Sequence, residues 1–156
     1  MVTTTPQAAS TPAATGKLPD GCGLIDDAAA VAAIGEAVVS KSAPQPPTDV
    51  STRCEWKGGG IHSLSLLVQR GTIAKSSFDN AVKGGFVSPA ATLPGTDTRV
   101  SLGTPETNRD YRLVSVASYN GTYYVYFTIQ GPRRADDVAI DIAKGLVRDS
   151  LKKLPS

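Results

Sequence analysis

Asn120-Gly121 separates two stretches of alternating apolar residues and is the strongest local signal in this chain. Asn-Gly is the preferred two-residue turn of a β-hairpin, because both residue types tolerate the positive φ angles that the turn requires. The pattern therefore predicts strands over 111–119 and 122–130, with this pair as their turn. Apolar residues lie on both faces of the predicted hairpin, which favours a central position in a sheet over an edge position.

Tyrosine is unevenly distributed between the two faces of this hairpin. Alternation along the strands places these side chains on one face: Val114, Val116, Tyr123, Val125, Phe127 and Ile129. The other face carries the following: Tyr111, Leu113, Ala117, Tyr119, Tyr124 and Tyr126. Two interpretations of these four tyrosines stay open. A helix or loop covers them and leaves their hydroxyls at the rim, or they line a groove that binds an apolar ligand, a glycan or a protein partner.

A second hairpin is predicted around Gly58-Gly59-Gly60, with strands over 52–57 and 61–70. Cys54 and Trp56 share one face of the first strand. A turn of three residues would set two cross-strand pairs: Trp56 opposite His62, and Cys54 opposite Leu64.

Apolar spacing predicts three helices, over 27–34, 73–83 and 136–154. Asp26 and Thr72 are candidate N-caps for the first two, and Asp79 and Lys83 are spaced to form an ion pair. The expected buried stripes are Leu24, Ala28, Val31 and Ala32 for the first helix; Ala74, Phe78, Ala81 and Val82 for the second; and Val138, Ile142, Ala143, Leu146, Val147, Leu151 and Leu154 for the third.

The remaining segments are predicted to be mostly loop. Residues 41–51 contain three prolines, which exclude a central strand, and 86–108 holds only one short candidate strand, at 98–102. The resulting order is helix, two strands, helix, one or more strands, hairpin and helix. This order indicates an α+β fold in which an antiparallel sheet is flanked by helices.

The N-terminal segment differs from the rest of the chain in composition. Residues 1–16 contain no charged and no aromatic side chain, and threonine, alanine and proline dominate. Such a segment cannot bury enough apolar surface to offset its conformational entropy. We expect residues 1–17 to form a disordered stalk and 18–156 to form one domain. The stalk is either a natural flexible terminus or, as we favour, what remains after an export signal and its anchor are removed.

The two cysteines, Cys22 and Cys54, are an even pair in a small domain, which favours a disulfide. The alternative is two reduced, buried cysteines in a cytosolic protein. The stalk independently suggests export and so supports the bridge. Since the chain has one histidine and no Cys-x-x-Cys spacing, it has too few ligands for a structural zinc site.

Charge and reactive residues point away from several functions. A formal charge of +2 does not favour a nucleic-acid binder. His62 is the only conventional general base, but a histidine at the end of an apolar strand is more often structural. Two carboxylate pairs, Asp26/Asp27 and Asp136/Asp137, lie at predicted helix starts, where capping explains them. We therefore expect no catalytic residues, no metal and no cofactor.

Two short motifs resemble a family of actinobacterial cell-envelope lipoproteins of unknown function. The first is Cys22-Gly-Leu-Ile followed by an alanine-rich helix that ends at Ile34-Gly35, and the second is Cys54-Glu55-Trp56. The resemblance covers roughly residues 18–154 and implies export, a lipid-anchored N-terminus and a Cys22–Cys54 bridge. Because related lipoproteins have a PsbP-like α/β/α sandwich, the resemblance implies that fold for this chain. The resemblance carries over no catalytic residue.

Together these observations predict an exported, non-enzymatic binding domain of the cell envelope, membrane-tethered or secreted. Its expected partners are an envelope component, an apolar ligand or another protein, and the domain itself is expected to be a monomer. Membrane contact would come only through a lipid anchor that this sequence does not contain. The alternatives are a sensor or accessory ectodomain of a larger envelope assembly and, less favoured, a hydrolase that uses His62 or paired carboxylates.

Overall fold

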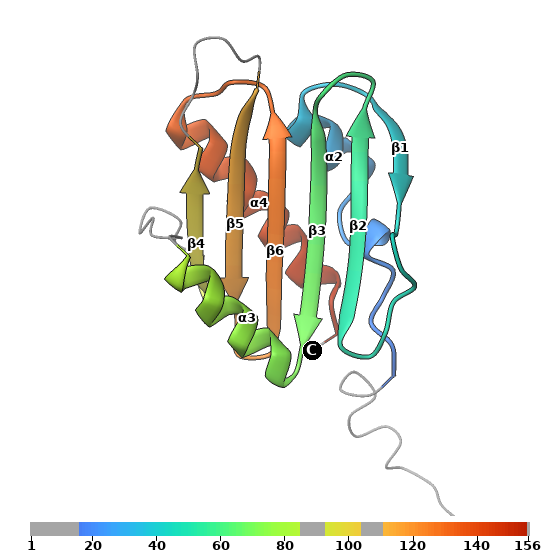
Figure 1. The fold of residues 1–156 in the computed structure, drawn as a ribbon, viewed down its shortest axis with the longest axis vertical. Helices are drawn as coiled ribbons and strands as arrows, with labels where there is room; N and C mark the ends of the chain where they lie inside the picture. The colour runs from blue at the N-terminus through green and yellow to red at the C-terminus, as the bar shows by residue number, and fades with distance from the viewer. Residues whose placement is uncertain (1–15, 85–92, 104–110, 156) are drawn as a thin grey trace, which may run out of the picture.

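A single antiparallel sheet of six strands forms the centre of the molecule, in the order β1-β2-β3-β6-β5-β4 (Figure 1). The computed structural model describes residues 16–84, 93–103 and 111–155. The strands are β1 (Val38–Ser42), β2 (Ser51–Gly58), β3 (Ser63–Arg70), β4 (Asp97–Leu102), β5 (Arg112–Tyr119) and β6 (Tyr123–Gly131). The predicted hairpin, β5–β6, lies inside the sheet, flanked by β3 and β4.

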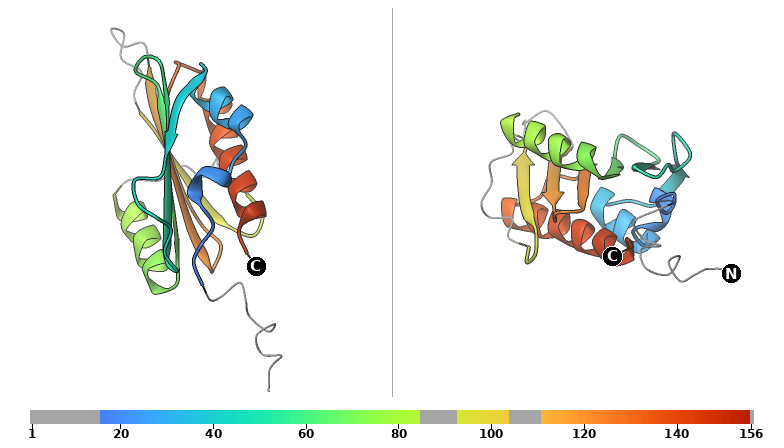
Figure 2. Two further views of the ribbon diagram at one scale, coloured as in Figure 1. Left: turned by 90° about the vertical axis from the view of Figure 1, so that its right-hand side faces the viewer. Right: turned by 90° about the horizontal axis from the view of Figure 1, so that it is seen from below.

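Helices cover both faces of this sheet. They are the short 3-10 helix η2 (Gly21–Gly23) and the α-helices α2 (Asp27–Ile34), α3 (Thr72–Lys83) and α4 (Asp136–Lys153). Figure 2 shows α2 and α4 on one face and α3 alone on the other. The α+β prediction is therefore confirmed, with helical layers on both sides of the sheet.

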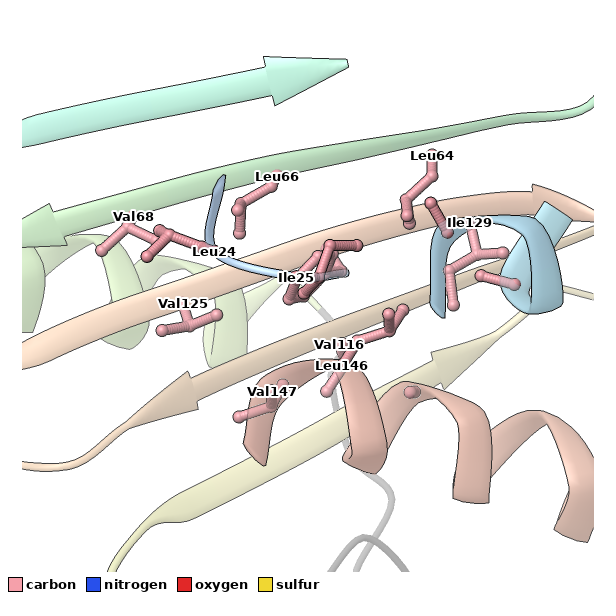
Figure 3. Packing of buried hydrophobic residues seen from close by; sticks show 14 of the residues in the cluster. Leu24, Ile25, Leu64, Leu66, Val68, Val116, Val125, Ile129, Leu146 and Val147 are labelled. Carbon is pink, nitrogen blue, oxygen red and sulfur yellow. The ribbon is translucent and has the colours of Figure 1, made fainter. Parts of the chain in front are cut away.

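The larger core lies between the sheet and the layer of α2 and α4 (Figure 3). Inward-facing strand residues pack there against side chains from η2, α2 and α4. The largest side chains that are almost wholly buried include Trp56, Phe127, Leu24, Ile34, Leu64, Ile129, Val68 and Val116. A smaller cluster of Ala74, Phe78, Ala117 and Tyr124 lies on the other face, beneath α3.

A disulfide joins Cys22 of η2 to Cys54 of β2. Cys54 is fully buried, and the bond fastens the start of the described chain to the inner face of the sheet. The favoured pairing is thus confirmed.

Both hairpins have a register different from the predicted one. In the first, the backbone N–H of Asn120 donates to Tyr123 O, and Tyr119 pairs with Tyr124, so the tip of the turn is Gly121-Thr122. In the second, Gly58 belongs to β2, and the turn is 59–61. The observed pairs are therefore Trp56 with Leu64 and Cys54 with Leu66. When a turn moves by one residue, each strand residue pairs with a partner two positions further along the opposite strand. Because side chains alternate between the faces with a period of two, every side chain keeps its predicted face.

The helices begin and end close to the predicted residues, but two of their buried faces differ. Helix α2 buries Ala30, Ala33 and Ile34, while Val31 is exposed. In α4, Val138 is 46% exposed and Ala139 is buried in its place. The predicted face of α3 is confirmed by buried Ala74 and Phe78, with Ala81 and Val82 packed against them.

The N-cap of α3, an ion pair on α3 and the presence of strand β1 also differ from the predictions. The N-cap of α3 is Gly71, one residue before the predicted Thr72. Asp79 pairs with Lys75, one turn earlier in the helix, instead of with Lys83. Strand β1 was not predicted, because Val38–Ser42 is an exposed edge strand without the alternation that marks a buried face.

Parts of several predictions lie outside the described residues. These are residues 1–15 of the expected stalk and, within the expected loop at 86–108, residues 86–92 and 104–108. The strand predicted at 98–102 is confirmed as β4, which begins one residue earlier.

Candidate functional site

The structure separates the four tyrosines that the sequence groups on one face. Tyr124 is buried beneath Phe78 of α3, and Tyr119 stacks on Phe78 with ring centroids 5.9 Å apart. Tyr126 stacks in turn on Tyr124 at 6.0 Å. Tyr111 precedes β5, at the opposite end of that strand from Tyr119. Three of the four thus form one aromatic cluster at the edge of α3, and Tyr111 lies apart.

Tyr119 borders a hollow that we call the basal hollow. Its volume is about 930 Å³. Three walls form it: the first turns of α3, the β5–β6 turn, and the loop before β2. The lining residues are Gly16, Asp49, Val50, Arg70, Gly71, Thr72, Lys75, Ser76, Asp79, Tyr119, Gly121, Thr122 and Tyr123.

Arg70, the last residue of β3, holds the loop wall in place. Its side chain is 8% exposed, and Nη2 donates to the carbonyl oxygens of Asp49 and Gly16, each at 2.6 Å. Gly71 follows with φ +86°, a conformation that L side chains rarely adopt, and it redirects the chain from β3 into α3. Arg70 therefore holds the loop wall, and Gly71 begins the wall that α3 forms.

The other two walls are also fixed by short-range hydrogen bonds. The carboxamide oxygen of Asn120 accepts from the backbone N–H groups of Thr122 and Tyr123, at 2.9 and 2.7 Å. On α3, Lys75 Nζ donates to both carboxylate oxygens of Asp79, at 2.7 Å each, and buried Ala74 and Phe78 pack the helix against the sheet. Because each wall is held by its own contacts, the hollow is preformed.

The charges that line the basal hollow balance. Arg70 and Lys75 are basic, while Asp49 and Asp79 are acidic. The hydroxyl-bearing residues Thr72, Ser76, Thr122 and Tyr119 lie among them, while the hydroxyl of Tyr123 donates to Pro155 O. Such a lining offers donors and acceptors side by side and selects neither an anion nor a cation.

His62 lies far from this hollow, at the β2–β3 turn. Its Nδ1 is 3.0 Å from Glu36 Oε2, but within the described residues neither ring nitrogen makes an aligned hydrogen bond. The backbone N–H of Gly59 donates to Glu36 Oε1 at 3.2 Å. A Cβ on Gly58 would lie 2.5 Å from Cδ of Glu36. The glycine run thus admits the Glu36 side chain, and His62 is not aligned on a nucleophile.

At the two sequence-adjacent carboxylate pairs the structure shows ion pairs in place of the predicted side-chain caps of α2 and α4. Asp26 accepts from Lys153 at 2.7 Å and Asp27 from Lys41 at 2.9 Å. The hydrogen bond from Lys153, followed by its charge, lowers the pKa of Asp26. Asp136 accepts from buried Arg112 at 2.7 Å. Lys153 at the end of α4 contacts Asp26 at the start of α2, so the two helices run in opposite directions. The two carboxylate pairs therefore lie at opposite ends of this helical layer and do not converge.

Of the residues that line the basal hollow, the sequence indicated only Tyr119 as a candidate for ligand binding. The lining residues come from four segments that share no motif, so topology alone brings them together. Arg70 is the one further lining residue that the sequence could have indicated, because a charged residue at the end of an apolar strand requires hydrogen-bond partners when it is buried.

Within the described residues, no three or more His, Cys, Asp or Glu side chains are grouped so that they could hold a metal ion. None of the described helices is both long and apolar enough to cross a bilayer. Comparison of the chain with protein-family models, with curated proteins and with solved structures gave no match.

Proposed function

We propose that this chain is a non-enzymatic binding domain outside the cytoplasm, which takes a component of the cell envelope in the basal hollow. A lipid anchor on the N-terminal side would hold the domain at the membrane. The observation that carries this proposal is the hollow itself, whose walls are held by the hydrogen bonds of Arg70 and Asn120 and by the packing of Phe78 beneath α3.

The disulfide supports the location. Disulfides persist in oxidising compartments and are rare in the cytosol, so the Cys22–Cys54 bond favours a place outside the cytoplasm. The resemblance of the two cysteine motifs to envelope lipoproteins agrees with this proposal.

The position of the hollow supports a role near the tether. Gly16 is the first described residue and itself lines the basal hollow. A ligand in this hollow would therefore lie beside the first described residue of the chain. This placement suits a protein that binds a component of the surface to which it is attached.

The lining supports binding over catalysis. Lys75 and Asp79 neutralise each other, the Ser76 hydroxyl donates to Ile73 O of its own helix, and the Tyr119 hydroxyl donates to Gly121 O. A nucleophile needs a neighbouring base to activate it, and these side chains are instead engaged with one another or with the backbone.

The test uses the full chain and washed envelopes of the organism that encodes it. Ser76→Trp and Thr122→Trp fill the hollow from opposite walls, while Asn80→Trp is the control, one helical turn beyond Ser76 and outside the lining. We expect the wild type and Asn80→Trp to sediment with envelopes and the two filling variants to remain in solution. Equal sedimentation of all four proteins would reject the hollow as the binding site.

Export and anchoring are tested separately on protein isolated from the native host. Intact mass before and after reduction should differ by two hydrogens, and the N-terminal region should carry a lipid. Free thiols on both cysteines would contradict the proposed location, and an unlipidated terminus would contradict the anchor.

A further inference from the structure

Two smaller hollows flank the basal hollow and share lining residues with it. On one side, a hollow of about 710 Å³ runs along the proline-containing loop and shares Gly16 and Asp49 with the basal hollow. On the other side, a hollow of about 410 Å³ beside Phe78 shares Lys75, Asp79 and Tyr119 with it. The three hollows therefore adjoin one another at shared lining residues, and together we call them the basal track.

The length of this track indicates an extended ligand. A single compact ligand needs a pocket of roughly 300–1,000 Å³, and the basal hollow alone meets that requirement. The flanking hollows add residues as far as Pro46 in one direction and Arg99 in the other. A ligand made of repeated units would use all three hollows, whereas a small molecule would leave two of them unused.

Charged groups along the track occur largely as pairs of opposite sign. Lys75 is bonded to Asp79, and Arg99 Nε donates to Asp97 Oδ1 at 2.9 Å. Each pair presents N–H donors next to carboxylate acceptors. Since a hydroxyl group both donates and accepts, a ligand with many hydroxyls can satisfy both members of such a pair.

Apolar residues line the track together with these polar groups. Val50 is 42% exposed, Pro46 and Pro47 line the loop side, and the partly exposed ring of Tyr119 lies where two hollows meet. A sugar ring has polar edges and apolar C–H faces, so a lining that combines apolar residues with ion pairs suits sugar units. A lipid chain would instead require a continuous apolar lining.

We infer that the basal track binds a linear, uncharged glycan of several sugar units. This inference rests on the proposed function and names the class of envelope component that the hollow takes. An extended peptide is less favoured, because peptides that bind by strand addition need the free edge of β1 or β4. Of those two strands, only the side chains of Asp97 and Arg99 reach the track.

The inference is tested by calorimetric titration of the full chain with three series of oligosaccharides. These are β-1,4-linked N-acetylglucosamine, α-1,4-linked glucose and α-1,6-linked mannose, each from two to eight units long. We expect one series to bind, with the six-unit member at least tenfold tighter than the two-unit member. Amide NMR signals of Thr72, Lys75, Gly121 and Thr122 should shift on binding.

Variants place the bound glycan on the track. Ser76→Trp and Thr122→Trp should each weaken binding of the six-unit oligosaccharide at least tenfold, and Asn80→Trp should leave it unchanged. Lack of binding by all three series, or affinity that does not depend on length, overturns the glycan inference. If sedimentation with envelopes still depends on the hollow in that case, the proposed function stands with another ligand; if it does not, both fail.

Discussion

Gly21 of η2 lies directly against the backbone of Arg53 in β2, so that a Cβ at Gly21 would be 2.7 Å from both the carbonyl carbon and the carbonyl oxygen of Arg53. The next residue in each segment is one half of the disulfide, Cys22 and Cys54. The absence of a side chain at Gly21 therefore permits the approach that brings the two sulfurs together.

We expect Gly21→Ala to destabilise the domain by about 1–3 kcal/mol, the usual cost of forcing extra atoms into a packed site. The obstacle is backbone and cannot rotate away. Gly23→Ala is the matched control in the same 3-10 helix, because nothing lies within 4 Å of its Cβ. Urea unfolding measures both free energies, and an equal effect of the two substitutions would contradict the close approach as the cause.

Removing the disulfide should cost roughly 3–4 kcal/mol by the chain-entropy relation, given a sequence separation of 32. The variant is Cys22→Ala together with Cys54→Ala, measured by urea unfolding. Dithiothreitol should lower the stability of the wild type by a similar amount and leave the double variant unchanged. A double variant as stable as the oxidised protein would show that the bond does not constrain the unfolded chain.

The fold class and the faces of the strands were predictable, but the registers were not. Alternating residues decide which side of a strand is buried, and that choice survives a shift of two positions. Whether Asn120-Gly121 or Gly121-Thr122 forms the tip depends on hydrogen bonds that the Asn120 side chain makes in the folded turn. The triple glycine was ambiguous in the same way, because Gly58 is needed inside β2 to admit Glu36.

Helix faces were predictable only where apolar residues differ in size from their neighbours. Phe78 fixes the buried side of α3, as predicted. In α2 nearly every residue is alanine or another apolar type, so periodicity could not distinguish Val31 from Ile34. The basal hollow was beyond prediction for a further reason, since its lining depends on how distant loops meet at one end of the sheet.

Arg112 is a buried charge whose loss should be costly. It is 7% exposed, and it donates to Gly103 O, Arg134 O and Asp136 Oδ1 at 2.8, 3.1 and 2.7 Å. We expect Arg112→Met to destabilise the domain by about 2–3 kcal/mol, because charged hydrogen bonds are lost and carbonyl oxygens are left without partners. Asp136→Asn should cost less than about 1 kcal/mol, since that carboxylate is largely exposed. Thermal unfolding of both variants distinguishes the two, and equal losses would contradict this assignment.

Burial, with a smaller contribution from Tyr126, raises the pKa of Tyr124 well above its ordinary value near 10. A raised pKa in the folded state contributes stability that is fully present below the unfolded pKa and is lost as pH rises beyond it. We therefore expect the free energy of unfolding to fall above about pH 10, and to fall less steeply in Tyr124→Phe. Urea unfolding at pH 8 and pH 11 provides the comparison. Identical pH dependence in the two proteins would show that Tyr124 ionises freely in the native state.

Phe78 determines how much of the tyrosine face is covered. Its ring packs on Tyr119 and Tyr124, so Phe78→Ala should cost about 3–5 kcal/mol, the usual range for truncating a buried phenylalanine. Ile73→Ala is the control on the same helix, because Ile73 is largely exposed, and its cost should stay within about 0.5 kcal/mol. Nitration followed by peptide mapping should modify Tyr124 slowly in the wild type and faster in Phe78→Ala, under conditions where both remain folded. Rapid nitration of Tyr124 in the wild type would instead mean that α3 leaves this face open and that the tyrosines are accessible to a ligand.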